Sequence, residues 1–204
     1  MDVLDLLAQY WQQQSVGELF AVAFAIAYVW LAAQESIWCW PAGFVSTSLY
    51  VYIYWDVTLF FQMLLNVYYM GMAVWGFLHW GKSGEDRVTI SRMEITEHAL
   101  VIVAGTIASG IVFLIAVQFL NYDLVLLDIV LTVFSLITTY LTVTKKLESW
   151  AYWSVINAVS IILLYDRELY PTMLLMFAYL VLALRGALQW NKLYKEANAC
   201  ANTI

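Results

Sequence analysis

The sequence predicts an all-α polytopic membrane protein with seven transmembrane helices. Of the 204 residues, 64% are hydrophobic and 12% are charged, and this charged share is about half that of a soluble domain. The apolar residues gather in long segments separated by short polar breaks, as helices that cross a bilayer require. These observations favour one membrane domain covering residues 1–204, in contact with lipid and without a separate water-soluble domain.

The elements follow from the apolar runs in chain order. Residues 1–15 contain no Lys or Arg and so lack the basic region of a signal peptide. We expect them to stay in the mature protein as a short helix at the membrane surface. Trp and Tyr near many span ends fit the aromatic belts of a bilayer. The runs that we interpret as spans cover residues 19–33, 37–55, 59–80, 99–120, 124–143, 150–164 and 169–190.

Basic residues lie mostly on one side of the predicted bundle. The breaks near residues 56, 122 and 167, on the same side as the N-terminus, carry Arg167 as their one basic residue. Because Lys and Arg in short loops mark the cytoplasmic side, we expect the loop 81–97 and the tail 191–204 in the cytoplasm and the N-terminus outside. The basic residues on that cytoplasmic side are Lys82, Arg87, Arg92, Lys145, Lys146, Lys192 and Lys195.

The sequence of spans two and three resembles that of spans six and seven. Residues 35–40 resemble residues 148–153, and the resemblance continues into the next span. Three helices reverse the direction of the chain, so a single linker helix, residues 98–121, is needed between repeats 16–80 and 122–190 to keep them parallel. This 3+1+3 plan is typical of transporters. The matching positions in the later spans are Tyr69, Ala73, Gly76 and Trp80 against Tyr179, Ala183, Gly186 and Trp190.

Three residues of the sixth span form the strongest candidate binding face. Trp150, Trp153 and Asn157 follow one another at helical-turn spacing and share one side of a helix. Two indoles can sandwich an aromatic or cationic ring, and the Asn157 amide both donates and accepts hydrogen bonds. The alternative for Trp150, at a helix end, is a place in the interfacial belt.

Further polar residues inside the spans extend this candidate site. Asn66 and Gln62 lie one turn apart on the third span, and Tyr69 and Tyr179 occupy matching repeat positions. Asp128, an acid inside the fifth span, is a functional candidate because a carboxylate in a bilayer is costly. Alternatively, the Asp128 carboxylate has no function in binding and only reaches the outer membrane interface.

Other classes of function have weaker support. His79 and His98 flank the loop 81–97, so a haem-binding redox protein is a remote alternative. Cys39 and Cys200 lie in no metal-binding pattern, and we expect no metal, cofactor or disulfide. The sequence contains no phosphate-binding loop, nucleophile elbow or zinc-protease motif, and no basic patch for nucleic acid. We therefore expect a transporter of a small solute and not an enzyme.

The pattern Glu148-Ser149-Trp150-x-x-Trp153 followed by Asn157 and Ser160 resembles the Pnu family of bacterial vitamin transporters, as does Asp128 ahead of Thr132 and Ser135. The resemblance implies a SWEET-like fold of seven helices, a homotrimer in the bacterial inner membrane, and vitamin uptake by facilitated diffusion with trapping by phosphorylation. The family's motif residues then fall on Trp150, Trp153 and Asn157. The pair Thr138-Thr139 and the start of span two, residues 38–41, look more like the thiamin branch. Thiamin is the expected substrate, and nicotinamide riboside is the alternative.

Overall fold

The computed structural model describes residues 16–56, 60–118, 125–166 and 170–201, and the predicted surface segment 1–15 lies outside them. Within the described residues the fold is all-α, as predicted. A short 3₁₀ helix, η1, covers Gly84–Asp86. The seven α-helices in the described part of the chain are α2 (Val16–Ala33), α3 (Cys39–Asp56), α4 (Phe60–Trp80), α5 (Ile95–Ala116), α6 (Val125–Val143), α7 (Ser149–Asp166) and α8 (Tyr170–Ala201). By length and hydropathy, α2, α5, α6 and α8 can each cross a membrane unaided.

Helix boundaries differ from the predicted spans by a few residues at several ends, and two of the differences have a clear cause. Helix α5 begins at Ile95, ahead of the predicted apolar run, because Glu94 and Glu97 form a capping box at its N-terminus. The Glu94 amide donates to Glu97 Oε2 over 2.8 Å. Helix α8 continues through most of the predicted tail to Ala201, where the polar residues Lys192 and Glu196 make an i,i+4 pair at 3.9 Å.

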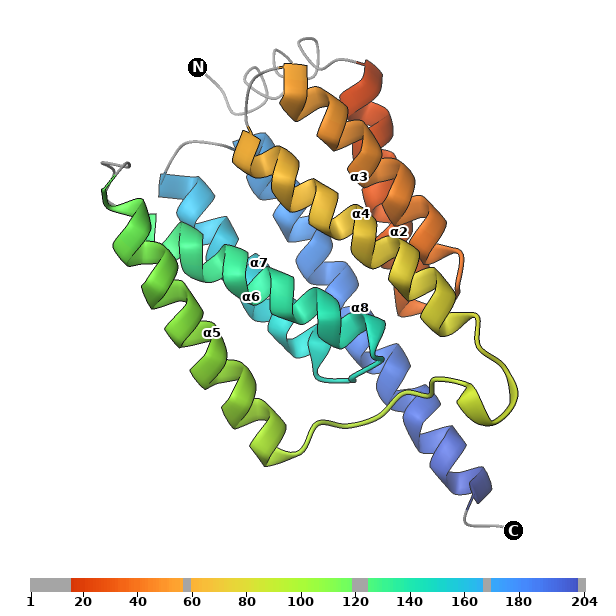
Figure 1. Cartoon of the computed structure of the whole chain (residues 1–204). Coiled ribbons are helices and arrows are strands. Elements are labelled where there is room, and N and C mark those ends of the chain that lie inside the picture. Colours follow the sequence, from red (N-terminus) through yellow and green to blue (C-terminus); the bar gives the residue numbers. More distant parts are fainter. Residues whose placement is uncertain (1–15, 57–59, 119–124, 167–169, 202–204) are drawn as a thin grey trace.

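The helices form two groups that meet along two seams (Figure 1). In the first group α3 packs between α2 and α4, and in the second α7 packs between α6 and α8. The seams join α2 to α8 and α4 to α6. Helix α5 packs against α6 at the outside of the second group (Figure 1). The interior between the groups is therefore bounded by six helices.

The surface of the bundle is apolar and part of its interior is polar. On α5, Leu100, Ile107 and Leu114 are 69%, 58% and 68% exposed, whereas Thr138 and Asn157 are buried. Such a surface is stable against lipid tails but not against water. The distribution agrees with a protein embedded in a membrane.

The two groups contain equivalent positions at a constant spacing of 110 residues. The Trp40 ring lies against Gly76, and the Trp150 ring lies against Gly186 in the same way. The sequence comparison of residues 35–40 with residues 148–153 is therefore wrong by three residues. That comparison aligned the Glu-Ser pair that both segments contain. The correct register is the one in which each tryptophan packs on a glycine of the third helix of its group.

The turns after the first helix of each group support the same register. Glu35 has φ 57° and Lys145 has φ 53°, a left-handed conformation that ends α2 and α6. Two equivalent tryptophans also donate hydrogen bonds from one group to the other. Trp80 Nε1 donates to the Val143 carbonyl over 2.8 Å, and Trp190 Nε1 donates to the Ala32 carbonyl over 3.0 Å.

Candidate functional site

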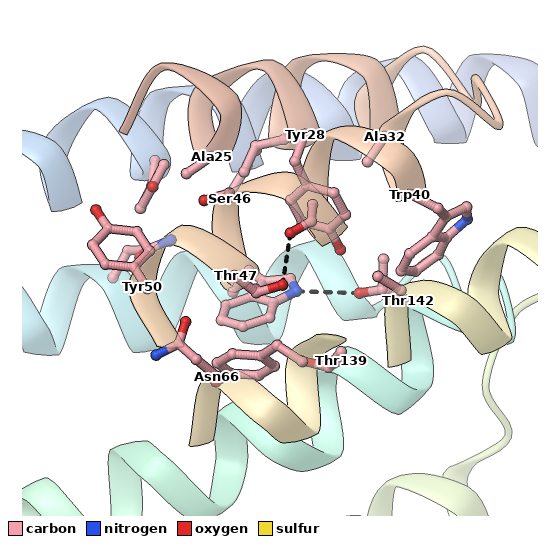
Figure 2. Close-up of a pocket in the computed structure, with 18 of the residues that line it drawn as sticks. Ala25, Tyr28, Ala32, Trp40, Ser46, Thr47, Tyr50, Asn66, Thr139 and Thr142 are labelled. Atoms are coloured by element: carbon pink, nitrogen blue, oxygen red, sulfur yellow. Dashed lines mark hydrogen bonds between the residues drawn. The ribbon is translucent and has the colours of Figure 1, made fainter. Parts of the chain in front are cut away.

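A cavity of about 230 Å³ lies between the two helix groups. It is far larger than the ~30 Å³ occupied by one water molecule, so it can hold a small organic molecule. Its lining comes from α2, α3 and α4 of the first group and from α6, α7 and α8 of the second (Figure 2). A ligand here would contact both groups at once.

The lining combines aromatic rings with uncharged hydrogen-bonding groups. None of the described lining residues is charged, so a cationic ligand would be held by π faces and dipoles instead of an ion pair. The aromatic lining residues are Tyr28, Trp40, Tyr50, Tyr69, Trp150, Trp153 and Tyr179. The hydroxyl and amide residues are Ser46, Thr47, Asn66, Thr139, Thr142 and Asn157.

Four tryptophans form a continuous layer at one end of the cavity. Ring centroids are 5.2 Å apart for Trp40 and Trp80, 5.9 Å for Trp80 and Trp190, and 5.4 Å for Trp190 and Trp150. The outer two contacts are edge-to-face, a favourable arrangement. The indole N–H groups of Trp40 and Trp150 have no hydrogen-bond partner among the described residues, so packing alone positions these two rings.

Most of the predicted site residues meet in this cavity. Trp150, Trp153 and Asn157 line it from α7. Trp150 is only 3% exposed and belongs to the tryptophan layer, whereas Trp153 is less buried. The other predicted residues that line the cavity are Asn66, Tyr69 and Tyr179.

Two predicted residues lie elsewhere. The side chain of Gln62 is exposed, and its backbone carbonyl accepts a hydrogen bond from Asn66 Nδ2 over 2.9 Å. Asp128 lies in the first turn of α6. Neither residue is part of the cavity lining, because each lies near the first turn of its helix. Gln62 is one turn before the lining residue Asn66, and Asp128 is about three turns before the lining residue Thr139. A direct role for them in binding has no support in this geometry.

Hydrogen bonds fix the orientation of Trp153. Its Nε1 donates to Thr142 Oγ1 over 3.1 Å, a bond drawn in Figure 2. Thr142 in turn donates to the Thr138 carbonyl one turn earlier, over 2.9 Å. The indole of Trp153 is thus held by α6 while its ring contributes to the cavity wall.

The first helix group supplies lining residues that the sequence did not single out. Those with an aromatic or polar side chain are Tyr28 from α2 and Trp40, Ser46, Thr47 and Tyr50 from α3. The repeat contained a signal for two of them. At the spacing of 110 residues, Trp40 is equivalent to Trp150 and Thr47 to Asn157. The three-residue error in the alignment paired Trp40 with Trp153 instead and concealed the equivalence of Thr47 with Asn157.

The two histidines of the redox alternative have separate partners. The His79 ring lies 5.5 Å from that of Trp75 on the same helix. His98 Nδ1 is 2.9 Å from the Tyr152 hydroxyl, and these rings are stacked. Among the described residues, no cluster of three or more His, Cys, Asp or Glu could hold a metal ion.

Comparison with known proteins gives a consistent result. Residues 15–192 match the family model described as nicotinamide mononucleotide transporter. The nicotinamide riboside transporter PnuC of Neisseria mucosa is 28% identical over 167 residues, which cover 76% of this chain and 64% of that protein, just under two thirds of its length. The protein of the same name from Haemophilus influenzae is 24% identical, over 96% of this chain and 89% of that protein.

A solved structure has the same fold. The crystal structure of the vitamin B3 transporter PnuC matches with a TM-score of 0.74 and 24% identity. The match covers 95% of this chain and 88% of the other. The all-helical architecture is therefore one that a known membrane transporter adopts.

Proposed function

We propose that this chain, which belongs to the Pnu family of membrane transporters, carries nicotinamide riboside across a bacterial membrane by facilitated diffusion. The family membership predicted from Trp150, Trp153 and Asn157 is confirmed by the match over residues 15–192. Membership makes a transport role, and not catalysis, the expected activity.

Nicotinamide riboside is a better substrate hypothesis than thiamin. The curated relatives are named nicotinamide riboside transporters, so the predicted thiamin substrate has no support from them and the predicted alternative fits better. Both molecules contain a cationic aromatic ring. They differ in the second half, which is a ribose with hydroxyl groups in one and a pyrimidine in the other.

The cavity between the helix groups is the observation that supports this function. The cationic nicotinamide ring would lie against the face of Trp153, and the amides of Asn157 and Asn66 would bind the ribose hydroxyls or the carboxamide. Asn66 is 9% exposed and Asn157 is 6% exposed, so their hydrogen bonds to a ligand would be shielded from water and discriminating. The uncharged lining suits a cation whose charge is spread over a ring.

Movement of the two helix groups would open the cavity to each side in turn. We assign residues 16–80 and 122–190 to two parallel three-helix repeats in a SWEET-like 3+1+3 arrangement, with residues 98–121 as the linker helix. The pairing of α2 with α8 and of α4 with α6 supports this assignment, because the cavity would then lie at the repeat interface, where transporters of this plan bind substrate. All seven helices would then cross the membrane.

The setting in the cell follows from charge and from the family. Because the loop 81–97 and the tail 191–204 are basic, the C-terminus would lie in the cytoplasm and the N-terminus outside. The membrane would be the bacterial inner membrane, where phosphorylation in the cytoplasm traps the vitamin. A homotrimer is the expected assembly, and light scattering of the detergent complex tests it.

Calorimetry with purified protein tests the substrate. We expect nicotinamide riboside to bind with a submicromolar Kd, which corresponds to more than about 8 kcal/mol, and thiamin to bind at least a hundredfold more weakly. Tight binding of thiamin alone would restore the thiamin hypothesis. Binding of neither, together with no uptake of nicotinamide riboside by proteoliposomes, would overturn the proposed function.

A further inference from the structure

The two helix groups are not equivalent at the cavity wall. At the spacing of 110 residues, Gly43 on α3 occupies the position of Trp153 on α7, and Tyr28 on α2 occupies the position of Thr138 on α6. Each group therefore pairs one aromatic residue with one small residue. The first group carries its ring on the first helix, whereas the second group carries its ring on the second helix.

In the first group, the glycine leaves space that the tyrosine ring fills. A Cβ atom added at Gly43 would lie 2.9 Å from Tyr28 Cδ2, which is closer than carbon atoms can approach. The Tyr28 ring also contacts Trp40, with centroids 5.7 Å apart and planes tilted by 56°. Figure 2 shows the Tyr28 ring reaching from α2 to the space between Trp40 and Thr47. Gly43 thus makes it possible for Tyr28 to line the cavity.

In the second group, Thr138 is bonded to its own helix, and Trp153 on the next helix contributes the ring to the cavity wall. Thr138 is fully buried, and its hydroxyl donates to the Phe134 carbonyl of its own helix over 2.7 Å. Trp153 lines the cavity from the next helix and is held by Thr142. At these two pairs of equivalent positions, each group therefore contributes one ring to the cavity wall.

We propose that Tyr28 is the second aromatic wall of the binding site and that the cationic ring of the substrate is held between Tyr28 and Trp153. This inference rests on the proposed function. Trp150, the predicted partner of Trp153, is only 3% exposed and packs against Gly186 and Trp190, so little of its ring surface is left for a ligand. Tyr28 is less buried. Tyr28 and Trp153 come from opposite groups, and closing the groups around a ring would bring both faces onto it.

The proposal explains how the cavity selects a charged ring without a charged side chain. A cation over an aromatic face is attracted by the ring quadrupole, and the attraction grows when water is excluded. Two such faces discriminate against an uncharged ring of the same shape. The hydroxyl of Tyr28 is not needed for this contact, so Phe should replace Tyr at position 28.

Binding of nicotinamide riboside by three purified variants tests the proposal. We expect Tyr28→Leu to weaken the Kd about tenfold, Tyr28→Phe to change it less than threefold, and Tyr52→Leu to leave it unchanged. Tyr52 is a matched control because it lies on α3 with 71% of its surface exposed. Wild-type binding combined with unchanged binding by Tyr28→Leu would overturn the inference and leave the proposed function standing. Absence of wild-type binding would instead count against the proposed function.

A second measurement separates ring contact from loss of folding. Dihydronicotinamide riboside has the same outline but an uncharged ring, so the preference of the wild-type protein for the cationic form should fall in Tyr28→Leu and persist in Tyr28→Phe. Gly43→Ala displaces the Tyr28 ring without removing it and should also lower that preference. In a Tyr28→Leu background, Gly43→Ala should add little, because its effect acts through the missing ring. An unchanged preference in Tyr28→Leu would contradict the proposal even if its affinity for both ligands fell.

Discussion

Glu35 and Lys145 occupy equivalent positions in the two helix groups, 110 residues apart, and form an ion pair of 2.6 Å between Glu35 Oε1 and Lys145 Nζ. The Lys145 side chain is 5% exposed and the Glu35 side chain 20%. Lys145 Nζ also lies 4.5 Å from the ring centroid of Trp80. The turns that end α2 and α6 are thus joined to each other beside the tryptophan layer.

Breaking this ion pair should destabilise the protein unequally. Glu35→Gln leaves a buried ammonium group without its counter-ion, which typically costs about 3 kcal/mol. Lys145→Met should cost less because the remaining carboxylate is nearer to water. Thermal unfolding in detergent, followed by tryptophan fluorescence, measures both, and the charge-exchanged double variant Glu35→Lys/Lys145→Glu should regain part of the loss. If Glu35→Gln unfolds at the wild-type temperature, the pair does not hold the groups together.

Removing the predicted ring and amide of α7 should abolish tight binding. Trp153→Ala should weaken nicotinamide riboside binding at least tenfold through the lost stacking surface. Asn157→Ala should do the same because a ligand group would be left without a buried partner. Calorimetry measures both effects, with Trp38→Ala as the control because that ring is 67% exposed. Normal binding by both Trp153→Ala and Asn157→Ala would place the site elsewhere.

Thr142 should act on the substrate through Trp153. Thr142→Val keeps the shape of the side chain but removes the acceptor for Trp153 Nε1, so the indole loses its fixed orientation. We expect nicotinamide riboside binding to weaken about threefold to tenfold while thermal stability falls by only about 1 kcal/mol. Thr144→Val is the matched control, since the Thr144 hydroxyl donates only to carbonyls of its own helix. Equal affinities for the two variants would contradict a positioning role.

Alanine substitutions at two glycines of α4 should have opposite effects on the stability of the protein. At Gly76 a Cβ atom would lie 2.4 Å from the Trp40 ring, so Gly76→Ala should destabilise the protein by about 1–3 kcal/mol through overpacking. At Gly71 nothing lies within 4 Å of the new atom, and alanine should stabilise the helix by up to about 1 kcal/mol. Thermal unfolding of the two variants compares them directly. A similar rise in both melting temperatures would show that the tryptophan layer is loosely packed.

Sequence patterns were sufficient to predict features that depend on one helix or one motif alone. The long apolar runs predicted the helices, because residues in lipid must be apolar whatever their tertiary neighbours are. The face shared by Trp150, Trp153 and Asn157 was visible from helical spacing alone. These three residues line the cavity, and the family that they indicated is confirmed.

Tertiary packing decided what depends on several helices at once. Tyr28 lines the cavity because Gly43, on another helix, leaves room for its ring, and no periodicity within α2 signals this. Gln62 and Asp128 lie outside the lining because the cavity between the groups does not extend to the starts of α4 and α6, where these two residues lie. The sequence by itself thus determined the helices, the family and one wall of the site. The packing of the two groups showed that the spacing of 110 residues, already visible in the third helix of each group, also holds at the start of the second helix. Packing alone determined the opposite wall, because contacts between helices far apart in the chain leave no regular spacing in the sequence.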